Sequence, residues 1–244
     1  MKKSIVLACL AVLFVLNVSA QIDGTGWYFG IGYNVGSTKN KPLNYIVDKY
    51  NSIRPYLDHK MDNNHILQGM ALSSNFFVDG FSFDMGWTGR HTNLYAQGID
   101  GSGVDRRRDI KLRDNSFYMG FGGRFMRLGP LQAILGFSMD IGAYKARTRV
   151  YATTDKAPDY TKLDEGLNFG ISPNIDFRFY FGDRGPSISV KPYYQFQLVK
   201  SDLNDLNEAL NPTALTDADF EGCRGYLSNF GAEFKLMLPL ARRK

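Results

Sequence analysis

The chain has 244 residues, with 29 Lys and Arg against 24 Asp and Glu, which gives a formal net charge of +5. So small a positive excess does not favour nucleic acid as a partner. With only two cysteines, Cys9 and Cys223, the chain also lacks the disulfide framework of a small secreted domain.

Residues 1–20 have the pattern of an export signal. Lys2 and Lys3 precede an apolar run from Ile5 to Leu16, and Val18-Ser19-Ala20 provides the small residues of a cleavage site. The apolar run is shorter than the roughly 20 residues that a membrane helix needs. The sequence therefore predicts two parts, a signal peptide over 1–20 and one mature domain over 21–244.

Cleavage after Ala20 would also remove Cys9 and leave Cys223 as the only cysteine, so no internal disulfide is expected. Cys9 lies in Val-Leu-Ala-Cys, which resembles a lipid-attachment site, but the apolar run continues past it. The remaining chain has no second apolar stretch long enough for a helical span. If it enters a bilayer, it must do so as a closed barrel, because lipid offers no partner to unpaired backbone groups.

Eight segments of the mature chain alternate apolar and polar residues with a period of two, which predicts β-strands. In chain order they cover residues 27–35, 66–78, 81–90, 116–126, 133–144, 167–181, 187–198 and 226–240. In NIDFRFYFG, residues 174–182, the three phenylalanines share one face while Asp176 and Arg178 share the other. In a soluble sheet the phenylalanines would be the core, whereas in a membrane barrel they would face lipid.

The links between these strands alternate in length. Three links are short and rich in Gly or Pro, as hairpin turns are: Asp79-Gly80, Arg127–Pro130 and Gly182–Pro186. The other four are long, over residues 36–65, 91–115, 145–166 and 199–225. This alternation is typical of outer-membrane barrels, which have short periplasmic turns and long outer loops.

The sequence therefore predicts an all-β fold: an eight-stranded antiparallel up-and-down transmembrane β-barrel with short periplasmic turns and four long outer loops. Several segments run longer than the five to six residues usual in soluble strands, and glycine keeps to the polar face. Because so narrow a barrel barely holds its own side chains, glycines there leave room for charged residues. An exported soluble sandwich or lipocalin-like barrel is the alternative. The expected location is the outer membrane, with both termini periplasmic.

Nine charged residues fall on the face predicted to line the barrel: Asp84, Arg90, Arg124, Asp140, Asp176, Arg178, Lys191, Glu233 and Lys235. Five are basic and four acidic, and a buried charge is tolerated when it is paired and hydrogen-bonded. The favoured interpretation is a salt-bridged structural plug. The alternative is a polar path or a small-solute site.

Catalysis and metal binding have little support in the sequence. Nucleophilic catalysis needs a Ser or Cys close to a His, and none of His59, His65 and His91 has a neighbourhood that stands out. Asp58, His59, Asp62 and His65 form only a loose cluster of metal-ligating types. We expect no enzyme activity, no metal and no cofactor.

Two of the long links have structure of their own. Pro42–Ile53 has apolar residues at helical spacing, ends before Pro55, and predicts an amphipathic helix whose apolar stripe covers the barrel rim, the bilayer interface or a partner. Leu203–Leu210 predicts one helical turn. Cys223 is expected to be an exposed or rim thiol.

Arg106-Arg107-Arg108 is a basic cluster in a predicted outer loop, at the level where lipopolysaccharide phosphates would lie. The forked guanidinium group suits phosphate. A run of three arginines is more often a solvated loop, and that alternative stays open.

Four stretches resemble one family: GWYFGIGYNVG, YIVDKYNSIRPYL, GFSFDMGW and FGAEFKLMLPL are similar to the PorT-like outer-membrane β-barrel proteins of Bacteroidota, small barrels of the OmpA and OmpX type. The resemblance implies an integral outer-membrane protein, and most such relatives have no assigned activity. The founding member serves protein secretion, which implies an accessory role of that kind. The basic tail Ala241–Lys244 departs from the terminal aromatic residue of many barrels.

Three hypotheses follow from the sequence. The first is a non-enzymatic barrel that stabilises the envelope or scaffolds an envelope protein partner through its outer loops, in contact with outer-membrane lipid and lipopolysaccharide. The second is a narrow channel or small-solute binder that uses the charged interior. The third, and least favoured, is a lipid A-modifying enzyme.

Overall fold

The computed structural model describes residues 26–38, 40–63, 65–182, 185–212 and 216–240. The predicted signal peptide over 1–20 and the basic tail over 241–244 lie outside these ranges. Among the helices of the described ranges, none is both long enough and apolar enough to cross a bilayer.

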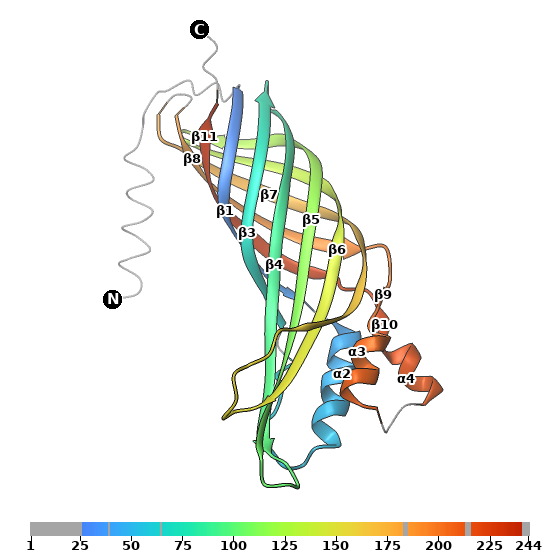
Figure 1. The fold of residues 1–244 in the computed structure, drawn as a ribbon. Helices are drawn as coiled ribbons and strands as arrows, with labels where there is room; N and C mark the ends of the chain where they lie inside the picture. Colours follow the sequence, from blue (N-terminus) through green and yellow to red (C-terminus); the bar gives the residue numbers. More distant parts are fainter. Residues whose placement is uncertain (1–25, 39, 64, 183–184, 213–215, 241–244) are drawn as a thin grey trace, which may run out of the picture.

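Eight long antiparallel strands form a closed ring (Figure 1). They are β1 (Gly26–Thr38), β3 (His65–Val78), β4 (Phe81–Ile99), β5 (Asp105–Leu128), β6 (Leu131–Ala152), β7 (Thr161–Tyr180), β8 (Ser187–Gln197) and β11 (Asn229–Pro239). Each long strand pairs with the next one along the chain, and β1 pairs with β11 to close the ring. The predicted eight-stranded up-and-down barrel is confirmed.

Tight turns join the strands at the end of the ring where β1 begins and β11 ends. Asp79 and Gly80, between the paired residues Val78 and Phe81, have φ values of 48° and 84°. Positive φ at both central residues is the geometry that matches the right-handed twist of a hairpin, and Asp-Gly is a preferred sequence for it. Gly129, in the second predicted turn, also has a positive φ of 56°. The third predicted turn includes residues 183–184, which lie outside the described residues.

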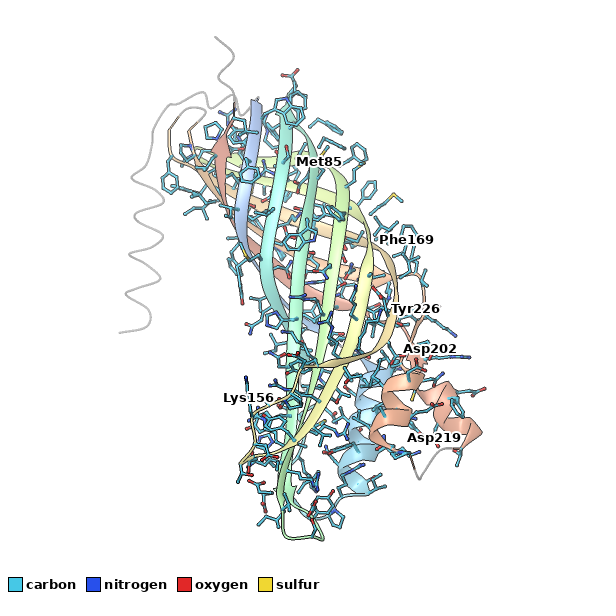
Figure 2. The ribbon with its side chains drawn as sticks, in the orientation of Figure 1. Met85, Lys156, Phe169, Asp202, Asp219 and Tyr226 are labelled. Atoms are coloured by element: carbon cyan, nitrogen blue, oxygen red, sulfur yellow. The ribbon has the colours of Figure 1, made fainter. Side chains whose placement is uncertain are left out.

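Side chains alternate between the two faces of the wall. Apolar residues point outward and remain exposed, for example Phe117 at 65% and Trp27 at 43%, while Arg178 points inward and is 2% exposed. Figure 2 shows Met85 and Phe169 on the outside of the barrel. The phenylalanines of β7 face outward and its Asp–Arg pair faces inward, as in a membrane barrel and unlike a soluble sheet.

Two of the predicted long loops are largely strand. β4 continues to Ile99 and β5 begins at Asp105, so the link predicted over residues 91–115 is a hairpin extension. β6 and β7 likewise extend into the link predicted over residues 145–166. Alternation continues in these extensions, but aliphatic residues point inward and charged residues point outward. The reason is that the inward side chains of the extensions pack on helices, whereas those of the ring pack on one another.

Two helices, α2 (Lys41–Ser52) and α3 (Asn204–Leu210), lie against the inner face of this extension, and a third, α4 (Asp217–Gly222), packs on α2 (Figure 1). The short strands β2 (Leu57–His59), β9 (Ser201–Asp202) and β10 (Arg224–Gly225) lie beside them. We call these helices, with the extended ends of β4–β7 that they contact, the outer cap.

The two predicted loop helices are present. In α2, Asn40 caps the N-terminus, where its Oδ1 accepts a hydrogen bond from the Leu43 N–H at 3.0 Å, and Pro42 occupies the first turn, where a missing N–H is tolerated. Ile53 was expected in the apolar stripe but is 40% exposed, because the helix ends at Ser52. α3 covers the predicted turn over 203–210, whereas α4 was not predicted.

Candidate functional site

The first of three charge networks in the barrel interior joins two neighbours on β7. The Arg178 Nη2 lies 2.5 Å from Asp176 Oδ2, and Arg178 Nη1 donates to Asn75 Oδ1 of β3 at 2.7 Å. The Ser189 hydroxyl donates to the other oxygen of Asp176 at 2.6 Å. Both charged side chains are almost completely buried. The pair is therefore fully desolvated and bridges opposite walls of the ring.

The second network alternates two lysines with two carboxylates. Lys191 Nζ lies 3.0 Å from Asp84 Oδ2 and 3.3 Å from Glu233 Oε2. Lys235 Nζ lies 2.9 Å from the same Glu233 oxygen and donates to the Tyr118 hydroxyl at 3.1 Å. Lys191 also lies 4.3 Å from the centre of the Tyr118 ring. Each lysine contacts at least one carboxylate, so the network is internally neutral.

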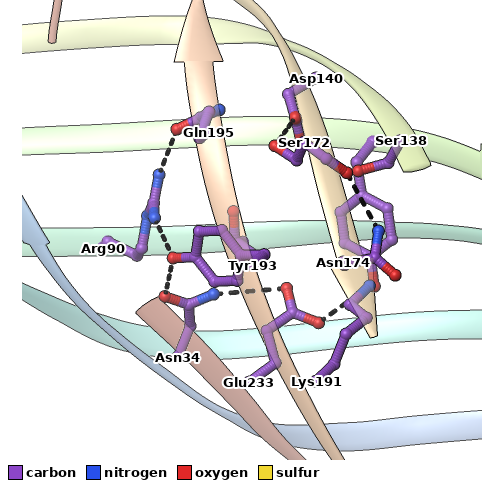
Figure 3. Close-up of a pocket in the computed structure, with 12 residues that line it drawn as sticks. Asn34, Arg90, Ser138, Asp140, Ser172, Asn174, Lys191, Tyr193, Gln195 and Glu233 are labelled. Carbon is purple, nitrogen blue, oxygen red and sulfur yellow. Dashed lines mark hydrogen bonds and ion pairs between the residues drawn. The ribbon is translucent and has the colours of Figure 1, made fainter. Parts of the chain in front are cut away.

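The third network centres on Arg90 (Figure 3). Arg90 forms an ion pair with Asp114 of β5 and donates to the Tyr193 hydroxyl at 2.6 Å and to Asn229 Oδ1 at 2.9 Å. Sequence reasoning missed Asp114 because it assigned residues 91–115 to a loop. Continuing the period-two alternation of β5 beyond Ser116 would have placed Asp114 on the inward face. With Asp114 included, the interior has five acidic and five basic residues.

Two of the predicted interior charges lie outside these networks. Asp140 accepts a hydrogen bond from the Ser172 hydroxyl, and within the described residues it forms no ion pair. Arg124 is half-buried at the turn end of the ring, with its guanidinium 5.6 Å from the centre of the Phe77 ring. We predicted all nine charges as one interior set. In the structure, seven of them belong to the three networks, and Asp140 and Arg124 lie apart.

Little space remains beside these networks. One cavity, lined by residues that include Asp140, Lys191 and Tyr193, has a volume of about 20 Å³ (Figure 3). A second, lined by residues that include Asp84, Asp176 and Arg178, is also about 20 Å³. Each has room for about one water molecule. This packing favours a plug over a solute path.

The three histidines occupy unrelated environments. His59 stacks on Tyr95 with ring centres 4.0 Å apart. His65 is buried, its Nε2 lies 2.6 Å from Asn44 Oδ1, and burial lowers its pKa to about 4. His91 lies on the outward face of β4. In the described ranges, no histidine hydrogen-bonds to a serine or cysteine, and no group of side chains has a metal-binding arrangement.

The outer cap has a hydrophobic core of its own. Leu43, Ile46 and Val47 of α2 pack with residues of α3 and with inward side chains of the extended strands; the strand residues are Leu94, Ala96, Ile110, Leu112, Tyr144 and Ala146. The apolar stripe of α2 therefore covers the inner face of the extended strands. Of the three surfaces that the sequence left open for this stripe, the structure has the barrel rim.

Cys223 lies in this core and is completely buried, so the expectation of an exposed or rim thiol was wrong. It follows directly after α4, where its backbone N–H donates to the Asp219 carbonyl, and its side chain packs with the core residues of α2 and α3. Burial raises the pKa of the thiol to about 12. At neutral pH the thiol is therefore protonated and shielded.

Two carboxylates attach the helices of the cap. Asp219 of α4 accepts hydrogen bonds from the Tyr45 hydroxyl and from Thr216, and its Oδ1 lies 2.6 Å from Lys49 Nζ of α2. These donors hold the pKa of Asp219 below its usual range. Asp164 of β7 accepts from the backbone N–H of Leu206 in α3 at 2.8 Å, and burial raises its pKa to about 6.

Arg106, Arg107 and Arg108 do not form one cluster, because they lie on strand β5 and alternate between its faces. Arg106 pairs with Asp100, and Arg107 Nε lies 2.7 Å from Asp109 Oδ1. Arg108 is half-buried, 5.9 Å from the centre of the Tyr50 ring. The predicted solvated loop is therefore a strand.

No protein-family model matches the chain, and no curated protein matches it. Among solved structures it is similar to the Neisserial surface protein A, with 7% sequence identity, a TM-score of 0.45, and coverage of 88% of this chain and 98% of that one. It is also similar to Ail, the attachment invasion locus protein of Yersinia pestis, with 11% identity, a TM-score of 0.41 and the same coverage of each chain.

Proposed function

We propose that this chain is an integral outer-membrane β-barrel without enzyme activity, and that it acts as a rigid scaffold whose outer cap contacts an envelope partner. The observation that carries the proposal is the combination of an exposed apolar outer wall with a packed, ion-paired interior. The export signal predicted over residues 1–20 brings such a chain to the envelope. Both termini would then lie on the periplasmic side, with the cap outside the cell.

The apolar wall is nearly as tall as the apolar band of about 25 Å that outer-membrane barrels present to lipid. On β5, the outward residues from Phe117 to Phe125 are exposed and mainly apolar. Eight residue steps of about 3.3 Å, at the tilt of about 40° usual in such barrels, give a band about 20 Å tall. Apolar side chains also face outward on the other long strands, and so large an exposed apolar surface is rare on soluble monomers. Outer-membrane lipid and lipopolysaccharide are the proposed surroundings.

The interior supports a scaffold over a channel. Cavities of about 20 Å³ beside mostly ion-paired charges leave no room for a hydrated solute. The cap, in contrast, presents exposed apolar side chains at Ile53 and Tyr56, next to α2. The resemblance to PorT-like barrels makes a secretion machine one candidate partner for this surface.

Two measurements test the proposal. In planar bilayers the purified chain should give no steady openings. In native membranes, a photo-crosslinking residue at Tyr56 should give a discrete protein adduct, while the same residue at lipid-facing Phe121 serves as the matched control and should give none. Steady openings that disappear when Arg178 is replaced would refute the scaffold and support the channel.

A further inference from the structure

The outward face of β4–β7 changes character just beyond the apolar wall. The last apolar row joins Trp87, Phe117 and Ile141 of β4, β5 and β6, which are cross-strand neighbours. The next row, two residues further along each strand, holds the small or neutral Gly89, Asn115 and Ala143. Beyond it the outward side chains of β5 and β6 are predominantly basic.

Two successive rows place like charges directly opposite each other. Arg113 of β5 pairs in register with Lys145 of β6, and Lys111 pairs with Arg147. His91 of β4 lies opposite Arg113 on its other side. Like charges in directly opposed positions destabilise a sheet. This arrangement therefore favours a bound anion beside any of the four cations that the sheet leaves without a carboxylate.

The acidic residues on this face pair with Lys145 and with cations outside these two rows. Glu165 of β7 lies 2.6 Å from Lys145 Nζ and 2.5 Å from Lys162 Nζ. Asp109 of β5 contacts Arg107 Nε at 2.7 Å and Arg149 Nε at 2.8 Å. Within the described residues, the remaining three cations form no ion pair: Lys111, Arg113 and Arg147. Burial and the charges of Lys111 and Arg113 lower the pKa of His91, which shows the sign of the local field.

We propose that Lys111, Arg113 and Arg147, the basic ladder, bind the phosphate groups of the outer leaflet's glycolipid. Four residue steps separate Phe117 from Arg113 and six separate it from Lys111, so at a tilt of about 40° the two rows lie about 10 and 15 Å beyond the last apolar row. Headgroups extend about 5 to 7 Å beyond the hydrocarbon core, so the long side chain of Arg113 reaches them and those of Lys111 and Arg147 extend toward them. The ladder lies on rigid strands, and arginine binds phosphate through two parallel hydrogen bonds. This inference rests on the membrane placement proposed above.

The test compares the ladder variant Lys111→Gln/Arg113→Gln/Arg147→Gln with a control, Arg106→Gln/Lys156→Gln/Arg224→Gln, which removes the same charge elsewhere on the outer end. The full chain is inserted into phosphatidylcholine vesicles, and insertion is scored by heat-modifiable migration. Binding of bisphosphorylated lipid A, of the same lipid without phosphates, and of heparin is then measured in detergent. A basic residue near an anionic membrane surface contributes about 1 kcal/mol, or roughly fivefold in affinity. The ladder variant should therefore lose at least about tenfold in affinity for phosphorylated lipid A, and the control less than about twofold.

Each result has a defined meaning. The proposal is overturned if the inserted ladder variant binds phosphorylated lipid A as the wild type does, or if the wild type does not distinguish the two lipids. It is also overturned if the ladder variant loses heparin binding while its lipid A binding is unchanged, because the ladder would then serve a soluble polyanion. Failure of the wild type to insert would instead refute the membrane placement itself, and the lipid site with it.

Discussion

Replacing Arg178 with methionine should destabilise the barrel more than any replacement of an exposed arginine. The Arg178 guanidinium is 2% exposed and contacts both Asp176 and Asn75. Methionine fills much of the same volume but leaves the Asp176 carboxylate buried with only the Ser189 hydroxyl as an identified partner. An isolated carboxylate in such surroundings is costly.

The magnitude follows from what each variant leaves behind. Breaking a buried ion pair by removing one partner costs about 3 to 5 kcal/mol, whereas removing both charges is often close to neutral. We therefore expect Arg178→Met to lower the free energy of unfolding by about 3 to 5 kcal/mol, within the range for such pairs. Asp176→Asn/Arg178→Met should lower it by only about 0 to 2 kcal/mol, since no unpaired charge remains.

Urea unfolding in phospholipid vesicles measures these values, with heat-modifiable migration and the fluorescence of Trp27 and Trp87 as probes. Arg127→Met, at an exposed arginine, is the matched control. If Arg178→Met costs no more than the control, or if the double variant costs the sum of its two single changes, the interior pair is not the desolvated unit described above.

Three further predictions concern the outer cap. Cys223 should react with maleimide far more slowly than a cysteine introduced at exposed Ser102, because its thiol is buried with a pKa raised to about 12; equal rates would place it at the surface. Ile46→Ala should destabilise the cap by about 2 to 5 kcal/mol while heat-modifiable migration of the barrel persists; limited proteolysis followed by mass spectrometry should then find new cleavage in the cap alone. Because the folded-state pKa of Asp164 is raised from 3.8 to about 6, the folded cap binds a proton more tightly than the unfolded chain, so its stability should rise as pH falls from 7 through 6, a gain complete only below about 3.8. The protection of the Leu206 amide against hydrogen exchange, corrected for the intrinsic pH dependence of exchange, should increase as pH falls from 7 in the wild type. In Asp164→Asn this protection should not change with pH.

The barrel could be predicted because a lipid boundary imposes a strong pattern. In residues 174–181 every outward position is apolar and every inward one is polar, so a single segment already indicated the two environments. Turn chemistry was equally informative, since Asp79-Gly80 adopts the positive φ values that its sequence favours. The α2 helix was also predictable, from its helical spacing and from Pro42.

The outer cap could not be predicted in the same way. Beyond the bilayer the two faces exchange roles: Leu94 and Ile110 point inward to the helices while charged residues point outward to water. Because we expected polar residues on the inner face throughout, we interpreted this inversion as the end of a strand. Asp114 was therefore assigned to a loop, and it was not recognised as the ion-pair partner of Arg90. The burial of Cys223 depends on contacts between distant loops, which no local pattern contains.

The pairing of β1 with β11 has a consequence for biogenesis. These are the first and last strands of the ring, so closure must wait until the whole chain has been delivered. Until then both strands carry unpaired edges that invite association with other chains. The cap core unites side chains from Leu43 to Cys223, so it too can be completed only at the end. Closure of the ring and completion of the cap core are therefore both late steps in the maturation of this protein.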